Sequence, residues 1–183
     1  MTQSLSNSTP PPNWERADEQ SAATFGRITR MLMRSPHYEN HTLADLNWLL
    51  LAPLTLKQFS LLRSRSTANP VKPTVLSSVA LWARVSDKID ARLMSNLSAP
   101  IKLSPDEWCS GSNVWIVDIL GDPAANQETL KRLRTVVFPG QTVKMRVLGR
   151  DKRPLIKLLN SSDEVAISTI VESLNDPARF KLH

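Results

Sequence analysis

The sequence predicts an α+β domain in which helices flank one mixed β-sheet. Helical and strand-like periodicities follow one another irregularly, in the order helix, helix, strand, strand, helix, strand, helix, strand, strand, helix. The stretch Val114–Leu120 has apolar residues at both odd- and even-numbered positions and is rich in β-branched residues. This pattern is typical of a central strand covered on both faces. At 183 residues without internal repeats, the chain fits one domain. We expect this domain at residues 21–183, after a disordered polar tail at residues 1–20.

The individual elements follow from spacing and from helix-breaking residues. Apolar residues recur at helical spacing over residues 21–34, and Ser35-Pro36 ends that helix because the residue before a proline avoids helical angles. Thr42, with Asp45 three residues later, resembles a capping box and opens a second helix that we expect Pro53 to stop. Further strands are expected at residues 58–63, 74–83, 142–148 and 154–159. Further helices are expected after Ser86, at 124–135 and at 162–174. In the helix after Ser86 we expect Ile89, Leu93 and Met94 to be buried.

The central strand carries one carboxylate, Asp118. Strict alternation would place it on the same face as Val114, Ile116 and Leu120. An isolated buried charge is too costly, so this carboxylate must be paired, hydrogen-bonded or protonated. Asp118 is therefore the first candidate for a functional residue. The alternative, left open by the strand alone, is a structural aspartate that caps a neighbouring loop.

The net charge of +6 is concentrated in the second half of the chain. Residues 126–157 hold nine basic side chains and only two acids. Such a segment predicts an acidic partner, which could be nucleic acid, anionic lipid or an acidic protein. A solvated basic face without a partner is the alternative interpretation.

Several classes of protein and site are not expected. The N-terminus has no leader pattern and no apolar run reaches the length of a membrane span, so we expect an intracellular, cytoplasmic protein. Five glycines do not build a phosphate-binding loop or a dinucleotide fingerprint, and one cysteine excludes a multi-cysteine metal site. His37 and His41 are four residues apart but follow a proline in a loop without a third ligand, so we expect no metal site.

Motifs between Phe25 and Arg150 resemble, in order and spacing, those of the lysine acyltransferases that activate RTX toxins. The matching pieces are Ser35-Pro36 with a nearby histidine, LADLNWLLLAPL at 43–54, KQFSLLR at 57–63, LWA at 81–83 with Val85-Ser86, Glu107-Trp108, Ser110-Gly111, VWIVDIL at 114–120, and FPG at 138–140 followed by the strand to Arg146. The resemblance implies a GNAT-like fold. It also implies fatty acyl transfer from acyl carrier protein to the ε-amine of internal lysines of an RTX-type protoxin, with no tightly bound cofactor.

The same resemblance implies two catalytic positions, a histidine shortly after Ser-Pro and the aspartate of the central strand. The aspartate corresponds to Asp118. The family pattern Ser-Pro-x-His departs here, because the chain reads Ser35-Pro36-His37-Tyr38 and an ungapped match puts Tyr38 at the histidine position. We expect His37 to be the functional base, with Tyr38 as a further candidate that could donate to the thioester carbonyl or to the leaving thiolate.

The residues themselves fit this chemistry. Amide formation needs a neutral amine, and a histidine with a pKa of about 6.5 can take the proton of a lysine. A carboxylate beside the imidazole fixes its tautomer and stabilises its charged form. Acyl carrier proteins are acidic, so the basic segment has a natural partner. The expected docking residues are Arg132, Arg134, Lys144, Arg146, Arg150 and Arg153.

Two other functions stay open on the sequence alone. A family member with an altered site would act as a module that binds the carrier protein or the toxin. The high pI of about 9.8 alone would also fit a basic nucleic-acid-binding protein, although we expect no nucleic-acid partner. The sequence leaves the oligomeric state open, a homodimer included.

Overall fold

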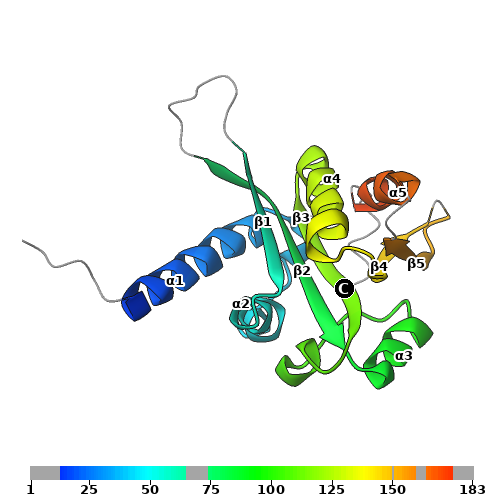
Figure 1. The fold of residues 1–183 in the computed structure, drawn as a ribbon, viewed down its shortest axis with the longest axis horizontal. Coiled ribbons are helices and arrows are strands. Elements are labelled where there is room, and N and C mark those ends of the chain that lie inside the picture. The colour runs from blue at the N-terminus through cyan, green and yellow to red at the C-terminus, as the bar shows by residue number, and fades with distance from the viewer. Residues whose placement is uncertain (1–12, 65–73, 150, 160–163, 175–183) are drawn as a thin grey trace, which may run out of the picture.

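The fold is built on a five-stranded sheet in the order β1-β2-β3-β4-β5, seen in a computed structural model that describes residues 13–64, 74–149, 151–159 and 164–174. Neighbouring strands are antiparallel except β3 and β4, which are parallel, so the sheet is mixed as predicted (Figure 1). The strands are β1 (Phe59–Ser64), β2 (Val75–Val85), β3 (Asn113–Gly121), β4 (Val143–Leu148) and β5 (Pro154–Leu159).

Helices cover both faces of this sheet, which confirms the predicted α+β domain with a GNAT-like arrangement. The α-helices are α1 (Asn13–Leu32), α2 (Ala52–Thr55), α3 (Asp87–Ser95), α4 (Pro123–Arg132) and α5 (Glu164–Leu174). Shorter helical turns are 3-10 helices at Pro36–Tyr38 and Pro105–Trp108 and π-helices at Asn47–Leu51 and Leu133–Val137. None of the helices in the described ranges is both long and apolar enough to cross a membrane.

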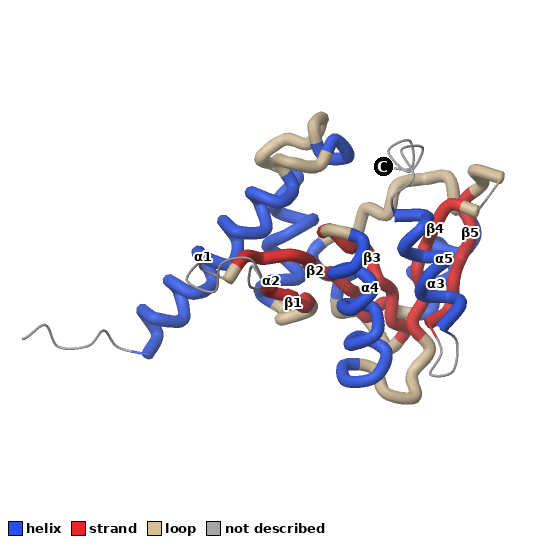
Figure 2. Tube along the Cα trace, turned by 90° about the horizontal axis from the view of Figure 1, so that it is seen from above, coloured by secondary structure: helices blue, strands red, loops and turns tan. Residues whose placement is uncertain are grey.

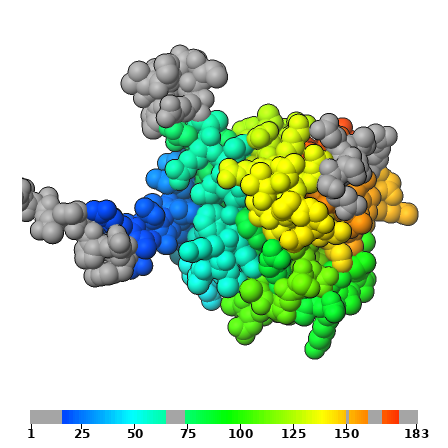
Figure 3. Space-filling model, in the orientation of Figure 1, coloured from blue at the N-terminus to red at the C-terminus, as the bar shows by residue number. Residues whose placement is uncertain are grey.

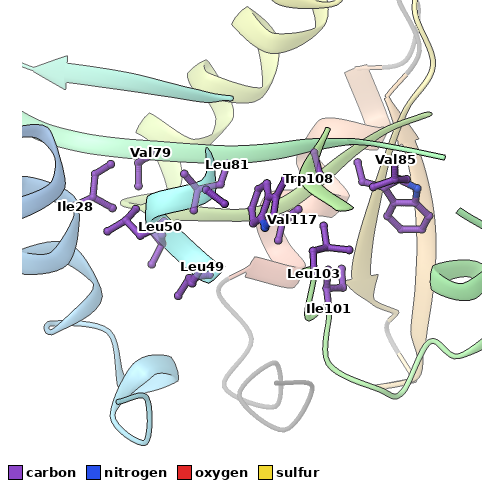
Figure 4. Close-up of a cluster of buried hydrophobic side chains, with 14 of the residues drawn as sticks. Ile28, Leu49, Leu50, Val79, Leu81, Val85, Ile101, Leu103, Trp108 and Val117 are labelled. Carbon is purple, nitrogen blue, oxygen red and sulfur yellow. The ribbon is translucent and has the colours of Figure 1, made fainter. Parts of the chain in front are cut away.

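Two apolar clusters fill the space between the sheet and its helices. One contains Ile28 of α1 and Leu81 of β2 and also takes in residues of α3; Figure 4 shows it from the side. The other lies on the opposite face, where α4 and α5 pack against β2, β3 and β4. The central strand β3 contributes to both clusters, as expected for a strand that is buried on both faces.

A β-bulge in β3 changes the side to which its carboxylate points. Leu81 pairs with Asp118 whereas Trp82 pairs with Ile116, so Val117 is an extra residue in β3. Directly paired residues share a face, and Leu81 belongs to the α1 cluster. Asp118 therefore lies on the α1 face, opposite Ile116. The prediction that Asp118 shares a face with Val114 and Ile116 is therefore wrong. One inserted residue reverses which face each later side chain of the strand points to.

The parallel strands β3 and β4 separate soon after they meet. Their ladder consists of three pairs, from Val114 opposite Val143 to Ile116 opposite Met145. Figure 2 shows the two strands joined near one end and diverging toward the other. The C-terminal half of β3, which includes Asp118, therefore has no β4 partner in the ladder.

Three predicted element details are wrong. Helix α1 begins at Asn13 rather than at residue 21, and its first part extends away from the body of the molecule (Figure 3). Arg16, Ala17, Glu19 and Gln20 in this part are good helix formers, a propensity that apolar spacing does not reveal. Pro53 does not stop the second helix, because it lies in the first turn of α2, where a missing N–H costs nothing. Met94 is 47% exposed, while Ile89 and Leu93 are buried as expected.

Candidate active site

A cavity of about 640 Å³ opens where the end of α1 meets the C-terminal end of β3. The three residues predicted for catalysis, His37, Tyr38 and Asp118, all line it. They come from two segments that are 80 residues apart in sequence, the turn after α1 and the central strand. The structure thus brings the predicted catalytic residues to one cavity.

Asp118 is held rigidly in the wall of this cavity. Its side chain is 2% exposed, and the backbone N–H of Ile119 donates to Oδ1 at 2.7 Å. The bulge at Val117 is the local reason for its direction, since a regular strand would turn the carboxylate into the apolar cluster under α4 and α5. A bulge beside a site commonly aims one side chain in this way.

His37 and Tyr38 lie in the 3-10 turn Pro36–Tyr38, which begins directly after α1. Ser35-Pro36 ends the helix as predicted, and the Tyr38 N–H then donates to the Ser35 carbonyl at 3.0 Å. The His37 ring meets the Tyr38 ring edge to face, with centroids 4.6 Å apart. His37 is partly buried, whereas Tyr38 is 8% exposed.

The segment after this turn is tied to the start of the next helix. The Thr42 N–H and hydroxyl both donate to Asp45 at 2.8 Å, and the Trp48 indole donates at 3.1 Å. These hydrogen bonds hold the pKa of Asp45 well below its usual range, and the bond from the Thr42 backbone N–H has the largest effect. His41 packs against Tyr38 with centroids 5.0 Å apart but is not among the residues that line the cavity.

A buried polar chain lies behind the cavity wall at Asn126, and sequence reasoning missed it. The Ser78 hydroxyl donates to the Asn126 side-chain oxygen at 2.8 Å and accepts from Thr129 at 2.9 Å, and all three residues are buried. The Asn126 amide donates to the Gly121 carbonyl at 3.2 Å. A signal was available in the sequence, because Asn126 and Thr129 lie on the helical face of α4 that also carries Leu130.

The turn between β3 and α4 depends on two residues of the segment Gly121-Asp122-Pro123. Gly121 has φ of 140°, and a Cβ there would lie 2.2 Å from the Ser77 carbonyl oxygen. Asp122 caps α4 by accepting from the Ala125 N–H at 2.9 Å. With Asp118 and Asp122 in its wall and Arg34 at the end of α1, the cavity carries charges of both signs.

The basic residues predicted to dock a carrier protein occupy different environments. Lys144 donates to both oxygens of Asp90 at 2.7 Å, and Asp90 also accepts from the Trp115 indole at 2.7 Å. Arg146 donates to the backbone carbonyls of Leu93, Asn96 and Ala99, and burial lowers its pKa. Both side chains thus join β4 to α3 and the loop after it.

The other four candidates lie elsewhere on the molecule. Arg132 is exposed at the end of α4, and Arg153 is 86% exposed with the Asp151 carboxylate 3.7 Å away. Arg134 is partly buried, and its Nε and Nη1 have no hydrogen-bond partner within the described ranges. Arg150 lies outside the described residues. In the part of the chain that the structure describes, no three His, Cys, Asp or Glu side chains gather into a group that could hold a metal ion.

Comparison with known proteins identifies the family. A family model described as the RTX toxin acyltransferase family matches residues 17–161. The chain belongs to this family. The match spans α1 to β5 and therefore includes both segments that carry the predicted catalytic residues of this RTX toxin acyltransferase family member.

A second comparison finds a distant relative. An uncharacterised protein of Synechocystis sp. is 21% identical over 141 residues, which cover 77% of this chain and 90% of that protein. Membership in the RTX toxin acyltransferase family supports an acyltransferase activity that acts on RTX toxins, and it confirms the resemblance seen in the sequence.

Proposed function

We propose that this protein transfers a fatty acyl group from acyl carrier protein to the ε-amine of internal lysines of an RTX-type protoxin. The observation that carries the proposal is the cavity lined by both His37 and Asp118 in a chain of the RTX toxin acyltransferase family. The thioester of the acyl carrier is the donor, and the reaction needs no tightly bound cofactor.

In this proposal His37 is the general base. A lysine side chain is protonated at neutral pH and becomes a nucleophile only after it loses that proton. The His37 imidazole takes the proton, and the amine attacks the thioester carbonyl carbon. When the carbon–sulfur bond breaks, the same imidazole gives this proton to the thiolate. The neutral imidazole then takes the second proton from the acylated nitrogen and releases it to solvent.

Asp118 serves this base by stabilising the imidazolium and fixing its tautomer. Its position on a buried strand supports this task, because a carboxylate fixed by the Ile119 N–H loses little orientational freedom when a histidine charges beside it.

Space for the donor is available at the same end of the sheet. The cavity volume is in the range of small-ligand sites. Because β3 pairs with β4 only as far as Ile116, we expect an extended thioester chain to lie along β3 beyond this point. Apolar side chains such as Met31, Leu76 and Leu174 also line this cavity and would contact the acyl group.

The carrier protein is proposed to dock near the C-terminal end of α4. Arg132 is about 15 Å along the helix from Asp122 at the cavity, given a rise of 1.5 Å per residue. Arg134, Arg150 and Arg153 remain in the proposed docking set. The carboxylate and carbonyl partners of Lys144 and Arg146 favour a structural role for those two residues, with a contribution only to the overall field.

The catalytic proposal is tested with a co-expressed protoxin and intact-mass analysis of the product. We expect His37→Ala and Asp118→Asn each to lower the acylation rate by at least about 100-fold, since general acid–base catalysis contributes roughly that much. His41→Ala is the matched control, because His41 lies in the same segment but does not line the cavity. Unchanged acylation in both site variants would contradict the proposed base, and a protoxin without any mass gain beside the wild-type protein would contradict the transfer itself.

Docking is tested separately through its salt dependence. Arg132→Glu should raise the KM for acyl carrier protein and flatten its rise with ionic strength, because an exposed cation acts through long-range charge. Arg27→Glu is the matched control, since Arg27 is equally exposed on α1. Equal effects of the two substitutions would place the docking surface elsewhere.

A further inference from the structure

Tyr38 carries a buried hydroxyl that the fold does not use. The residue is 8% exposed, and its hydroxyl oxygen has no hydrogen-bond partner within the described part of the chain. Its ring already packs between those of His37 and His41, with centroid distances of 4.6 and 5.0 Å. A phenylalanine would make the same ring contacts, so packing alone does not explain the hydroxyl.

Buried polar groups in folded proteins almost always have a partner, because an unsatisfied donor retains its full desolvation cost. Such a group on a residue that lines a cavity indicates that a ligand supplies the missing acceptor. Tyr38 lines the cavity that also contains Asp118. The acceptor is therefore expected among the atoms that enter this cavity during the reaction.

Some of the other polar groups in the wall are already engaged within the fold. The Asn126 amide donates to the Gly121 carbonyl, and the hydroxyls of Ser64 and Ser77 are bonded to each other. A phenol is a neutral donor with a pKa of about 10, so it can hold a developing negative charge and still keep its proton near pH 7. That property matches the carbonyl oxygen of a thioester under attack.

We propose that the Tyr38 hydroxyl is the oxyanion donor of the acyl transfer, an inference that rests on the proposed function. As the lysine nitrogen bonds to the carbonyl carbon, the π electrons of the carbonyl move to its oxygen, which accepts a hydrogen bond from Tyr38. The oxyanion then collapses, the carbon–sulfur bond breaks, and the thiolate takes the proton held by His37. The neutral His37 imidazole then takes the second proton from the acylated nitrogen and releases it to solvent. Tyr38 keeps its own proton throughout, and an amide, a thiol and one proton leave the site.

The assignment gives the departure from the family pattern a chemical role. The chain has tyrosine where the Ser-Pro-x-His pattern has histidine, and His37 lies one residue earlier. The two residues then divide the work, with proton transfer at His37 and carbonyl polarisation at Tyr38. Because they share the turn Pro36–Tyr38, both are set against the same cavity wall.

The first test compares Tyr38→Phe with the wild-type protein in acylation of a purified protoxin by acyl carrier protein loaded with a fatty acid. We expect kcat to fall about 100-fold or more, the usual effect of losing one oxyanion donor, while the KM for the carrier stays within twofold. The melting temperature should stay the same or rise, because the removed hydroxyl has no partner in the fold. A structural role would instead lower the melting temperature and leave kcat of the folded protein unchanged, which overturns the inference.

A second test uses the fact that Tyr38 is the only tyrosine of the chain. Growth on 3-fluorotyrosine or 3,5-difluorotyrosine therefore alters this phenol alone and makes it a stronger donor. We expect kcat, measured at a pH where the fluorinated phenol is still protonated, to change in order with phenol acidity, and no dependence on acidity would contradict the oxyanion role. Asp118→Asn separates the two proposals: if it abolishes transfer while every Tyr38 variant is fully active, the function stands and the oxyanion assignment fails.

Discussion

Replacing Lys144 by methionine tests whether this residue belongs to the fold or to the docking surface. Its ammonium group lies 2.7 Å from both carboxylate oxygens of Asp90, and the two side chains are only 18% and 14% exposed. The substitution keeps the aliphatic volume near Trp115 but removes the positive charge. Asp90 is then left partly buried, with the Trp115 indole still donating to one of its oxygens.

The size of the effect follows from this geometry. Removing one partner of a buried ion pair costs about 3–5 kcal/mol, because the other charge stays uncompensated. The indole bond and the residual exposure of Asp90 reduce that figure, so we expect Lys144→Met to lower the free energy of unfolding by about 2–3 kcal/mol. With a urea m-value of about 2 kcal/mol/M, the midpoint would fall by about 1 M.

A double-mutant cycle in urea isolates the pair. Asp90→Asn keeps an acceptor for Trp115, and the double variant should recover most of the loss, with a coupling energy of about 2 kcal/mol. The KM for acyl carrier protein should stay close to the wild-type value in the folded Lys144→Met protein. A coupling energy below about 1 kcal/mol, or a raised KM at unchanged stability, would refute the structural role of Lys144.

Two further predictions concern the turn before α4 and the ion pair under α3. Gly121→Ala should cost more than about 2 kcal/mol and lower acylation, because its Cβ would lie 2.2 Å from the Ser77 carbonyl oxygen at a φ that side chains rarely adopt; a urea midpoint within error of wild type would contradict this. Glu107→Gln should destabilise the protein slightly at pH 7, by less than about 1 kcal/mol given that Arg92 is 49% exposed. The Arg92 guanidinium lowers the folded-state pKa of Glu107, so the pair stabilises the fold above the unfolded pKa of about 4.3 and loses this effect as pH falls through the lower folded value. The stabilities of the variant and the wild type, measured by urea unfolding from pH 7 to pH 3, should therefore converge at the acidic end, and a gap that persists there would show that the carboxylate charge is not the cause.

Most elements of the fold were predictable because each has a local cause. Val114–Leu120 is apolar on both parities and proves to be the central strand, and Ser35-Pro36 ends α1 through backbone sterics alone. The end of the second helix was not predictable in this way. A π-helical segment over Asn47–Leu51 precedes Pro53, and the new helical turn that begins there tolerates the proline.

The candidate site was predictable in its residues but not in its geometry. The resemblance led to His37 and Asp118, and both line one cavity. The bulge at Val117 could not be predicted from the sequence. A β-bulge depends on how two strands pair, and the residue pattern of one strand does not show it. The roles of Lys144 and Arg146 were hidden for a similar reason, since their partners lie on α3 and on the loop that follows it, about 50 residues away in sequence.

The short ladder between β3 and β4 has a mechanical consequence. Three strands on one side and the β4–β5 hairpin on the other are joined by only three residue pairs, so the sheet is weakest along this seam. Side chains hold the seam instead. The apolar cluster under α4 and α5 crosses it from β2 and β3 to β4, and Lys144 and Arg146 bond to α3 and the loop after it. The β3–β4 boundary therefore depends on side-chain packing more than on backbone hydrogen bonds, so a substitution that leaves a cavity in this cluster would loosen it before the longer ladders of the sheet.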